Sequence, residues 1–110
     1  MKTLILVLLI LSASVAFAAD TLKVEKIKTS AVCDDCKDRI ESNLSKIDGI
    51  KSAVLNLDSN LITVQFDESV ISKEIIKEKI NDIGYDADDY QRSKKAFKKL
   101  PRCCRLEEKH

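Results

Sequence analysis

The spacing of hydrophobic positions changes from strand-like to helical near residue 33. Residues 22–28 place apolar side chains in a run rich in Lys and Glu, which is typical of an edge strand. From Asp34 onward, apolar positions recur at intervals of four, four and three residues, as on one face of an amphipathic helix. These positions are Cys36, Ile40, Leu44 and Ile47. The Asp48-Gly49 pair is expected to end the helix, because glycine is common just beyond a helix C-terminus.

Two alternating apolar runs follow the helix and predict a β-hairpin. Residues 51–57 and 62–66 each place apolar side chains on one face, and the polar residues 58–60 between them are typical of a turn. The first run contributes Ala53, Leu55 and Leu57, and the second contributes Ile62, Val64 and Phe66.

A second helix and a short last strand complete the predicted pattern. Ser72 is a residue type that caps helix N-termini, and Gly84 lies where a C-terminal glycine is expected. Residues 85–89 predict the last strand. The order β-α-β-β-α-β is typical of the ferredoxin-like α+β sandwich, in which two helices cover one face of a four-stranded antiparallel sheet. The predicted core comprises Ile40, Leu44, Leu55, Ile62, Val64, Phe66, Ile76, Ile80 and Ile83.

The N-terminal segment has the features of a secretory signal peptide. A short basic start, an apolar run over residues 4–11 and an Ala-x-Ala site ending at Ala18 are typical of such segments. The alternative is a membrane anchor, but a span takes about 20 apolar residues and this run is marginal for that. We therefore expect residues 1–18 to be removed. The mature protein would be exported to the periplasm or the extracellular space, without stable insertion in the membrane.

Charge divides the remaining chain into an acidic body and a basic tail. Residues 19–90 carry 10 Lys and Arg against 16 Asp and Glu, a net charge of −6. Residues 91–110 carry 8 Lys and Arg against 2 Asp and Glu, a net charge of +6. We expect one domain over residues 19–90, and a tail that either folds back onto it or is solvated. The protein is expected to be a monomer. We expect it to bind no nucleic acid, because the basic stretch has few aromatic residues.

Four cysteines carry the candidate chemistry. Cys33 and Cys36 form a Cys-Asp-Asp-Cys tetrad at the predicted helix start, where two thiols can bind one soft metal ion or form a reversible disulfide. The carboxylates between them oppose thiolate formation, whereas the helix N-terminus favours it. Cys103 and Cys104 in the tail either form a disulfide, stay unpaired, or supply further metal ligands.

Residues 22–88 resemble the heavy-metal-associated domain, a family that includes small metallochaperones, periplasmic mercury-binding proteins and the N-terminal modules of metal-pumping ATPases. The run Ser30-Ala31-Val32-Cys33-Asp34-Asp35-Cys36 matches the family signature Gly-Met-x-Cys-x-x-Cys, with Ser-Ala in place of Gly-Met. Further matches are Asp48-Gly49-Ile50, Phe66-Asp67 and Gly84-Tyr85. The resemblance implies that Cys33 and Cys36 bind one metal ion, with Cu(I) or Hg(II) favoured. It also implies that Tyr85 lies near the metal loop.

The resemblance further implies a carrier, chaperone or scavenger rather than an enzyme. Its partner would be a metal-transporting membrane protein or another metal carrier. Zn(II) or Cd(II) would need more ligands, commonly four for zinc, and Cys103 and Cys104 could supply them. Two alternatives stay open from the residues alone: a thiol–disulfide redox protein, or a structural module in which the tetrad is a disulfide staple. His110, the last residue, is not expected to take part.

Overall fold

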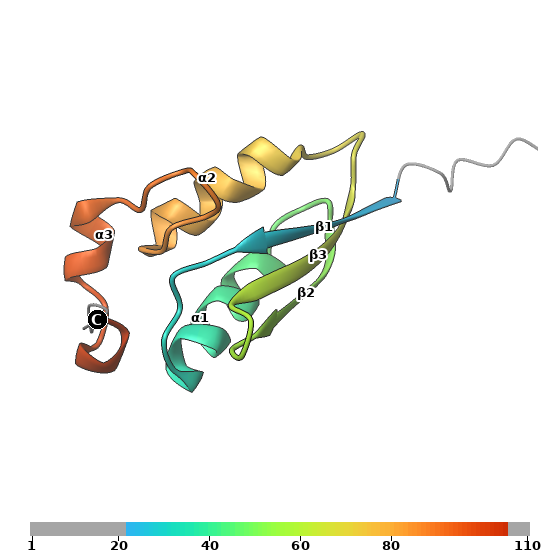
Figure 1. The fold of residues 1–110 in the computed structure, drawn as a ribbon. Coiled ribbons are helices and arrows are strands. Elements are labelled where there is room, and N and C mark those ends of the chain that lie inside the picture. The colour runs from blue at the N-terminus through green and yellow to red at the C-terminus, as the bar shows by residue number, and fades with distance from the viewer. Residues whose placement is uncertain (1–21, 106–110) are drawn as a thin grey trace, which may run out of the picture.

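The computed structural model describes residues 22–105; the expected signal peptide and His110 lie outside the described residues. The elements follow the predicted order up to the second helix (Figure 1). They are β1 (Leu22–Lys28), α1 (Asp34–Ser45), β2 (Ile50–Asn56), β3 (Leu61–Asp67), α2 (Lys73–Ile83), α3 (Lys94–Lys98) and the 3-10 helix η3 (Arg102–Arg105). Among these elements, no helix has the length and apolar character needed to cross a membrane.

The predicted hairpin is confirmed, and it forms the centre of an antiparallel sheet with strand order β1-β3-β2. Ile62 of β3 lies opposite Leu55 of β2 and Ile27 of β1. Within the turn, the Asn56 side chain accepts hydrogen bonds from the backbone N–H groups of Asp58 at 2.8 Å and Ser59 at 3.2 Å. This side-chain turn fixes the register that brings the apolar positions of the three strands to one face.

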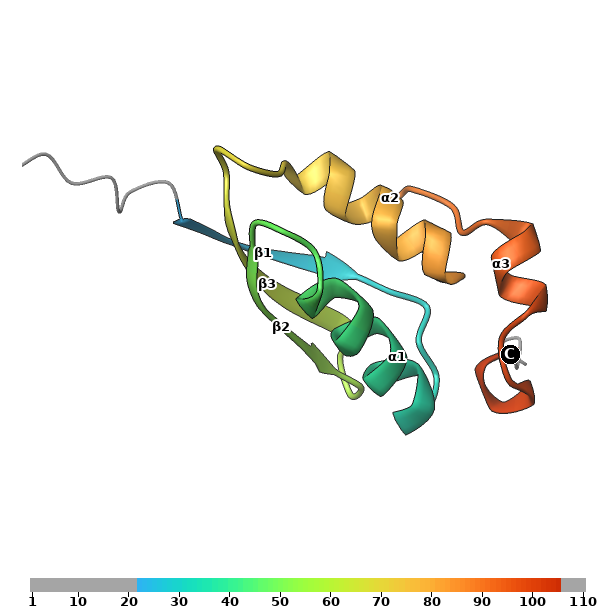
Figure 2. The ribbon, with the colours of Figure 1, turned by 180° about the vertical axis from the view of Figure 1, so that it is seen from behind.

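The core lies between that sheet face and the helices α1 and α2, which lie side by side (Figures 1 and 2). Eight of the nine predicted core residues are buried, and the prediction was wrong for Ile83, which is only partly buried. Ile83 is the last residue of α2 and lines a surface hollow between α1, α2 and α3. The eight buried residues are Ile40, Leu44, Leu55, Ile62, Val64, Phe66, Ile76 and Ile80.

The predicted caps of α2 are confirmed. Ser72 Oγ accepts a hydrogen bond from the backbone N–H of Ile75 at 3.2 Å. At the other end, Gly84 adopts a φ of +119°, which L residues rarely adopt. A Cβ at Gly84 would lie 3.0 Å from Leu100 Cδ1 and 3.2 Å from the backbone N of Phe97. Glycine is therefore needed here both for the backbone turn and for the close approach of the segment that follows.

We expect Gly84→Ala to lower the free energy of unfolding by about 2–3 kcal/mol, through strain at positive φ and displacement of Leu100. Urea denaturation of the variant and the unmodified protein measures the change. Asn60→Gly is a matched control, because Asn60 has a φ of 61° in the hairpin turn and should change stability by less than about 0.5 kcal/mol. Equal midpoints for Gly84→Ala and the unmodified protein would show that this position is not constrained.

The prediction of a four-stranded sheet was wrong, because residues 22–105 form three strands. Residues 85–89 contribute only isolated bridges, from Ala87 to Thr29 and from Ala87 to Tyr90. The backbone reverses at Asp88, which has a φ of 52°, so that Ala87 and Tyr90 exchange backbone hydrogen bonds of 2.9 and 2.8 Å. The chain therefore turns away from β1 where a fourth strand would continue.

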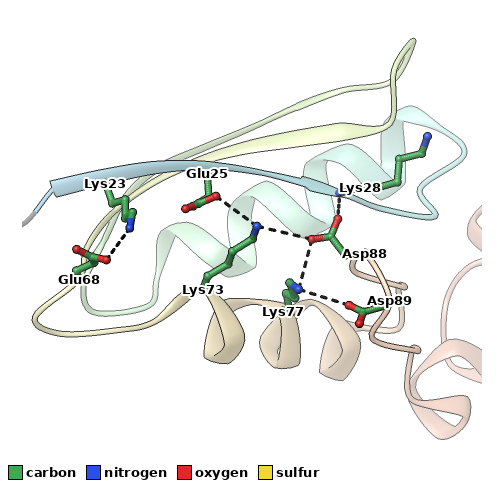
Figure 3. Close-up of polar contacts among 8 residues, drawn as sticks. All are labelled: Lys23, Glu25, Lys28, Glu68, Lys73, Lys77, Asp88 and Asp89. Carbon is green, nitrogen blue, oxygen red and sulfur yellow. Dashed lines mark hydrogen bonds and ion pairs between the residues drawn. The ribbon is translucent and has the colours of Figure 1, made fainter.

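Charged side chains lie beside β1 at this turn (Figure 3). Asp88 Oδ1 accepts the backbone N–H of Lys28 at 2.9 Å, and Asp88 Oδ2 lies 3.5 Å from Lys77 Nζ. Lys73 Nζ lies 3.3 Å from Glu25 Oε1. A side-chain carboxylate thus accepts a hydrogen bond that the carbonyl of a paired strand would otherwise accept. Partly exposed ion pairs of this kind contribute no more than about 1 kcal/mol each, so their main effect is on the path of the chain.

After the turn, the chain is held against the end of α2 by hydrogen bonds to Asn81. Its Nδ2 donates to the carbonyls of Tyr85 at 3.0 Å and Tyr90 at 3.1 Å. The backbone carbonyl of Asn81 accepts the backbone N–H of Ser93 at 3.1 Å. Ser93 Oγ then caps α3 by accepting the backbone N–H of Ala96 at 3.1 Å. These bonds set the direction in which the basic tail leaves the end of α2.

The basic tail packs on the body through two buried side chains, those of Leu100 and Cys104. Leu100 is 6% exposed and Cys104 is 3% exposed, and both belong to the same buried cluster as the sheet and helices. As a result, η3 lies beside the N-terminal end of α1, although about 70 residues separate the two in the sequence (Figures 1 and 2).

Candidate metal centre

Cys33 and Cys36 lie at the N-terminus of α1. Cys33 is the N-cap residue, and its carbonyl accepts the backbone N–H groups of Cys36 at 3.0 Å and Lys37 at 3.1 Å. This first turn places the two Sγ atoms 3.4 Å apart. Cys36 is fully buried and Cys33 is half-buried. The unpaired N–H groups and the dipole of a helix N-terminus favour the thiolate form of such cysteines.

Two hydrogen bonds hold the loop that precedes Cys33. Ala31 is 1% exposed, and its N–H lies within hydrogen-bond distance of Thr29 Oγ1, at 3.4 Å. Ser30 Oγ accepts the backbone N–H of Asp86 at 2.9 Å. Ala31 stands where the family signature has methionine, and in this chain it belongs to the buried core. The loop therefore connects directly with the segment after α2.

The tail thiols lie against Cys33. Cys33 Sγ is 3.2 Å from Cys103 Sγ and 3.6 Å from Cys104 Sγ, and the two tail sulfurs are 3.9 Å apart. The Sγ atoms of these three residues all lie within 4.8 Å of one another. All four cysteines are free thiols, since these separations exceed the roughly 2.05 Å of a disulfide bond. The structure thus brings Cys33, Cys103 and Cys104 into one group, and Cys36 adjoins that group through its contact with Cys33.

The environment gives these thiols different acidities. Burial opposes ionisation of Cys33, but its hydrogen bonding with the Cys103 thiol and the Cys36 backbone outweighs burial, so the pKa of Cys33 lies below its ordinary value. The neighbouring Cys33 and partial burial raise the pKa of Cys103 to about 11. Burial and the adjacent Cys36 raise the pKa of Cys104 well above its ordinary value. Cys33 therefore ionises more readily than the tail cysteines Cys103 and Cys104.

We expect iodoacetamide to alkylate Cys33 before Cys103 in the reduced, metal-free protein at neutral pH. A lowered pKa gives Cys33 more thiolate at a given pH, and Cys103 should become reactive only as the pH approaches about 11. Peptide mass spectrometry of samples quenched between about pH 6 and 11 gives the order of modification. Faster alkylation of Cys103 at neutral pH would contradict this order, and the urea-unfolded chain serves as the control for intrinsic reactivity.

Two further side chains border the thiols. The Tyr85 hydroxyl is buried and has no hydrogen-bond partner among residues 22–105. Burial, followed by the neighbouring thiols of Cys104 and Cys36, raises the pKa of Tyr85 far above its ordinary value, so the hydroxyl keeps its proton. Asp35 Oδ2 accepts a hydrogen bond from Cys103 Sγ at 3.4 Å. A buried O–H without an acceptor, beside thiols that lose their protons on metal binding, fits a site that holds thiolate ligands.

The comparisons with known proteins identify the region that carries the tetrad. The sequence pattern of the heavy-metal-associated domain matches residues 26–86, more than half of the chain. The chain belongs to the heavy-metal-associated domain family. The matched region of this domain includes Cys33, Cys36 and Tyr85, whereas Cys103 and Cys104 lie beyond it.

Similar proteins cover the same region of the domain. A protein of Staphylococcus haemolyticus named copper chaperone CopZ is 46% identical over 54 residues, which are 49% of this chain and 79% of that protein. A solved structure titled CopZ metallochaperone is 36% identical, with a TM-score of 0.57 over 59% of this chain and 98% of that one. The N-terminal domain of a potential copper-translocating P-type ATPase from Bacillus subtilis, in a Cu(I)-loaded state, is 26% identical with a TM-score of 0.58, over 61% and 85%.

Proposed function

We propose that this protein is a carrier, without catalytic activity, that holds one soft metal ion between the thiolates of Cys33 and Cys36. The observation that supports the proposal most directly is the pair of Sγ atoms 3.4 Å apart at a helix N-terminus, in a domain of the heavy-metal-associated family. Thiolate ligands select soft ions, and Cu(I) and Hg(II) are satisfied by two sulfurs. The similarity to proteins named copper chaperones favours Cu(I).

The accessibility of the two thiols suits transfer of the ion. Cys36 is buried, whereas Cys33 is half-buried and forms the edge of the site. Once the tail thiols that lie against Cys33 move aside, an incoming thiolate from a partner can reach the ion on the Cys33 side before Cys36 releases it. We propose that the partner is a metal-transporting membrane protein or another carrier. The similarity to the N-terminal domain of a potential copper-translocating P-type ATPase supports a transporter.

We further propose that the carrier acts outside the cytoplasm as a monomer. The support is the signal-peptide pattern of residues 1–18. Cell fractionation together with the intact mass of the purified mature protein tests this part. Recovery of the full 110-residue chain from the cytoplasm would contradict it.

Native mass spectrometry of the reduced protein, titrated with Cu(I), Hg(II), Zn(II) and Cd(II), tests metal identity and stoichiometry together. The proposal expects one Cu(I) or Hg(II) ion per chain to survive competition with a low-molecular-weight thiol. Complete loss of both ions to that competitor would contradict the proposal.

A thiol–disulfide redox role is the second candidate, because the pKa of Cys33 is lowered and two other sulfurs lie within 3.4 Å of it. An insulin-reduction assay, with the reduction potential of the cluster measured in glutathione buffers, distinguishes the two functions. Catalysed insulin reduction together with absence of tight metal binding would favour the redox role.

A further inference from the structure

We propose that Cys103 and Cys104 are built-in ligands that close the Cys33–Cys36 site into a sulfur-rich site of at least three thiolates. This inference rests on the proposed function and extends it to the segment outside the matched family region. The ligand class is a thiophilic ion that takes three or four sulfurs, such as Cd(II) or Zn(II). In this state the carrier retains its ion, and transfer requires η3 to move away.

The sulfur positions fit a shared ion. An ion with sulfur ligands at about 2.3 Å places those sulfurs about 3.8 Å apart in a tetrahedral arrangement, and slightly further apart in a trigonal one. The observed distances from Cys33 Sγ to Cys103 and Cys104, and between the tail sulfurs, are 3.2, 3.6 and 3.9 Å. Small side-chain movements therefore suffice. A linear two-sulfur site would instead place its two sulfurs on opposite sides of the ion, and only Cys33 and Cys36 would be needed.

The fold places the tail thiols, because η3 is anchored on both sides. Leu100 packs against Gly84, and a Cβ at Gly84 would come within 3.0 Å of it. Cys104 is 3% exposed, and Arg105 Nε donates to the Leu100 carbonyl at 2.8 Å, closing the turn of η3. The buried thiol of Cys104 loses less entropy on binding than a thiol of a free tail would, which favours chelation.

The charge of the segment fits a thiolate-rich site. Three or four thiolates around one divalent ion leave a net negative charge, which is costly in a partly buried position. Arg102 and Arg105 flank the two cysteines directly. These two arginines therefore supply positive charge beside the extra thiolates.

The test compares four forms of the reduced full-length chain: unmodified, Cys103→Ser/Cys104→Ser, Cys33→Ser/Cys36→Ser and Lys94→Ser/Lys95→Ser. The last is a matched control, because it changes two exposed residues of the same segment and removes no sulfur. Cd(II) affinity is measured by competition with a chromophoric chelator, and 113Cd NMR reports the number of bound sulfurs. Cu(I) affinity is measured in parallel, and circular dichroism checks the fold.

We expect Cys103→Ser/Cys104→Ser to weaken Cd(II) at least tenfold and to reduce the sulfur count, while Cu(I) affinity changes less than about threefold. The lysine control should match the unmodified protein. Equal Cd(II) affinity and equal sulfur count in the tail variant and the unmodified protein would overturn the inference. If the double variant does not fold, Cys103→Ser alone, at a half-exposed position, should still lower the sulfur count by one. Full metal binding by Cys33→Ser/Cys36→Ser would instead overturn the proposed function itself.

Discussion

Replacing Cys33 and Cys36 together with serine should abolish tight binding of Cu(I) and Hg(II). Serine keeps the size of the side chain but supplies a hard oxygen that does not ionise at neutral pH, so the chelating pair is lost. We expect the affinity to fall by at least about 1,000-fold, which corresponds to about 4 kcal/mol of binding free energy. Competition with a Cu(I) chelator, followed by absorbance, measures the change.

The fold should survive this substitution, because both residues lie at a loop and the first turn of α1. Cys36 is fully buried, so a serine hydroxyl there costs about 1–3 kcal/mol unless it finds a partner. Cys33→Ala/Cys36→Ala is a second variant without that cost, and both should lose the ion equally. Unchanged Cu(I) binding by either double variant would disprove the assignment of the tetrad.

Truncation after Tyr90 should destabilise the body as well as change the metal preference. It removes Leu100 and Cys104 from the core and leaves the end of α2 uncovered. Loss of a buried leucine and part of the surrounding contacts should lower the free energy of unfolding by roughly 3 kcal/mol. Urea denaturation measures this, and metal titration of the same protein should show Cu(I) or Hg(II) binding retained with Zn(II) or Cd(II) binding weakened.

Salt distinguishes packing from charge attraction in this comparison. The body and the basic tail carry opposite net charges, and physiological salt screens exposed charges beyond about 8 Å. If Leu100 and Cys104 hold the segment, the difference in stability between full-length and truncated proteins should persist at high salt. Equal stability of the two proteins in low and high salt would show that the tail does not pack on the body.

The sequence predicted the body of the fold because its signals are local. The alternation of Ile62, Val64 and Phe66 and the helical spacing of Ile40 and Leu44 each identify an element whose buried face the structure confirms. The Ser72 and Gly84 caps were readable for the same reason, since each acts on its own neighbouring backbone. The tetrad was readable because two cysteines at a helix start are a short-range pattern.

The prediction of a fourth strand was wrong because contacts with distant residues outweigh the local strand pattern of residues 85–89. Residues 85–89 have strand-like positions, but Asp88 bonds the backbone of Lys28 and pairs with lysines of α2. Those partners lie 11 to 60 residues away in the sequence, so no local pattern of residues 85–89 reveals the turn. The helical spacing of α2 also predicted that Ile83 is buried. Ile83 is the last residue of that helix, and its side chain is only partly buried there.

The sequence by itself determined the β-α-β-β-α order, eight of the nine predicted core residues and the placement of two thiols, Cys33 and Cys36, at a helix start. For the tail cysteines the sequence left three alternatives: a disulfide, unpaired thiols or further metal ligands. Composition and net charge carry no information on where these residues lie in the fold. Only the tertiary structure decided that Cys103 and Cys104 lie within 3.6 Å of Cys33. The physical reason is that this contact depends on the reversal at Asp88, the hydrogen bonds of Asn81 and the packing of Leu100 on Gly84 acting together.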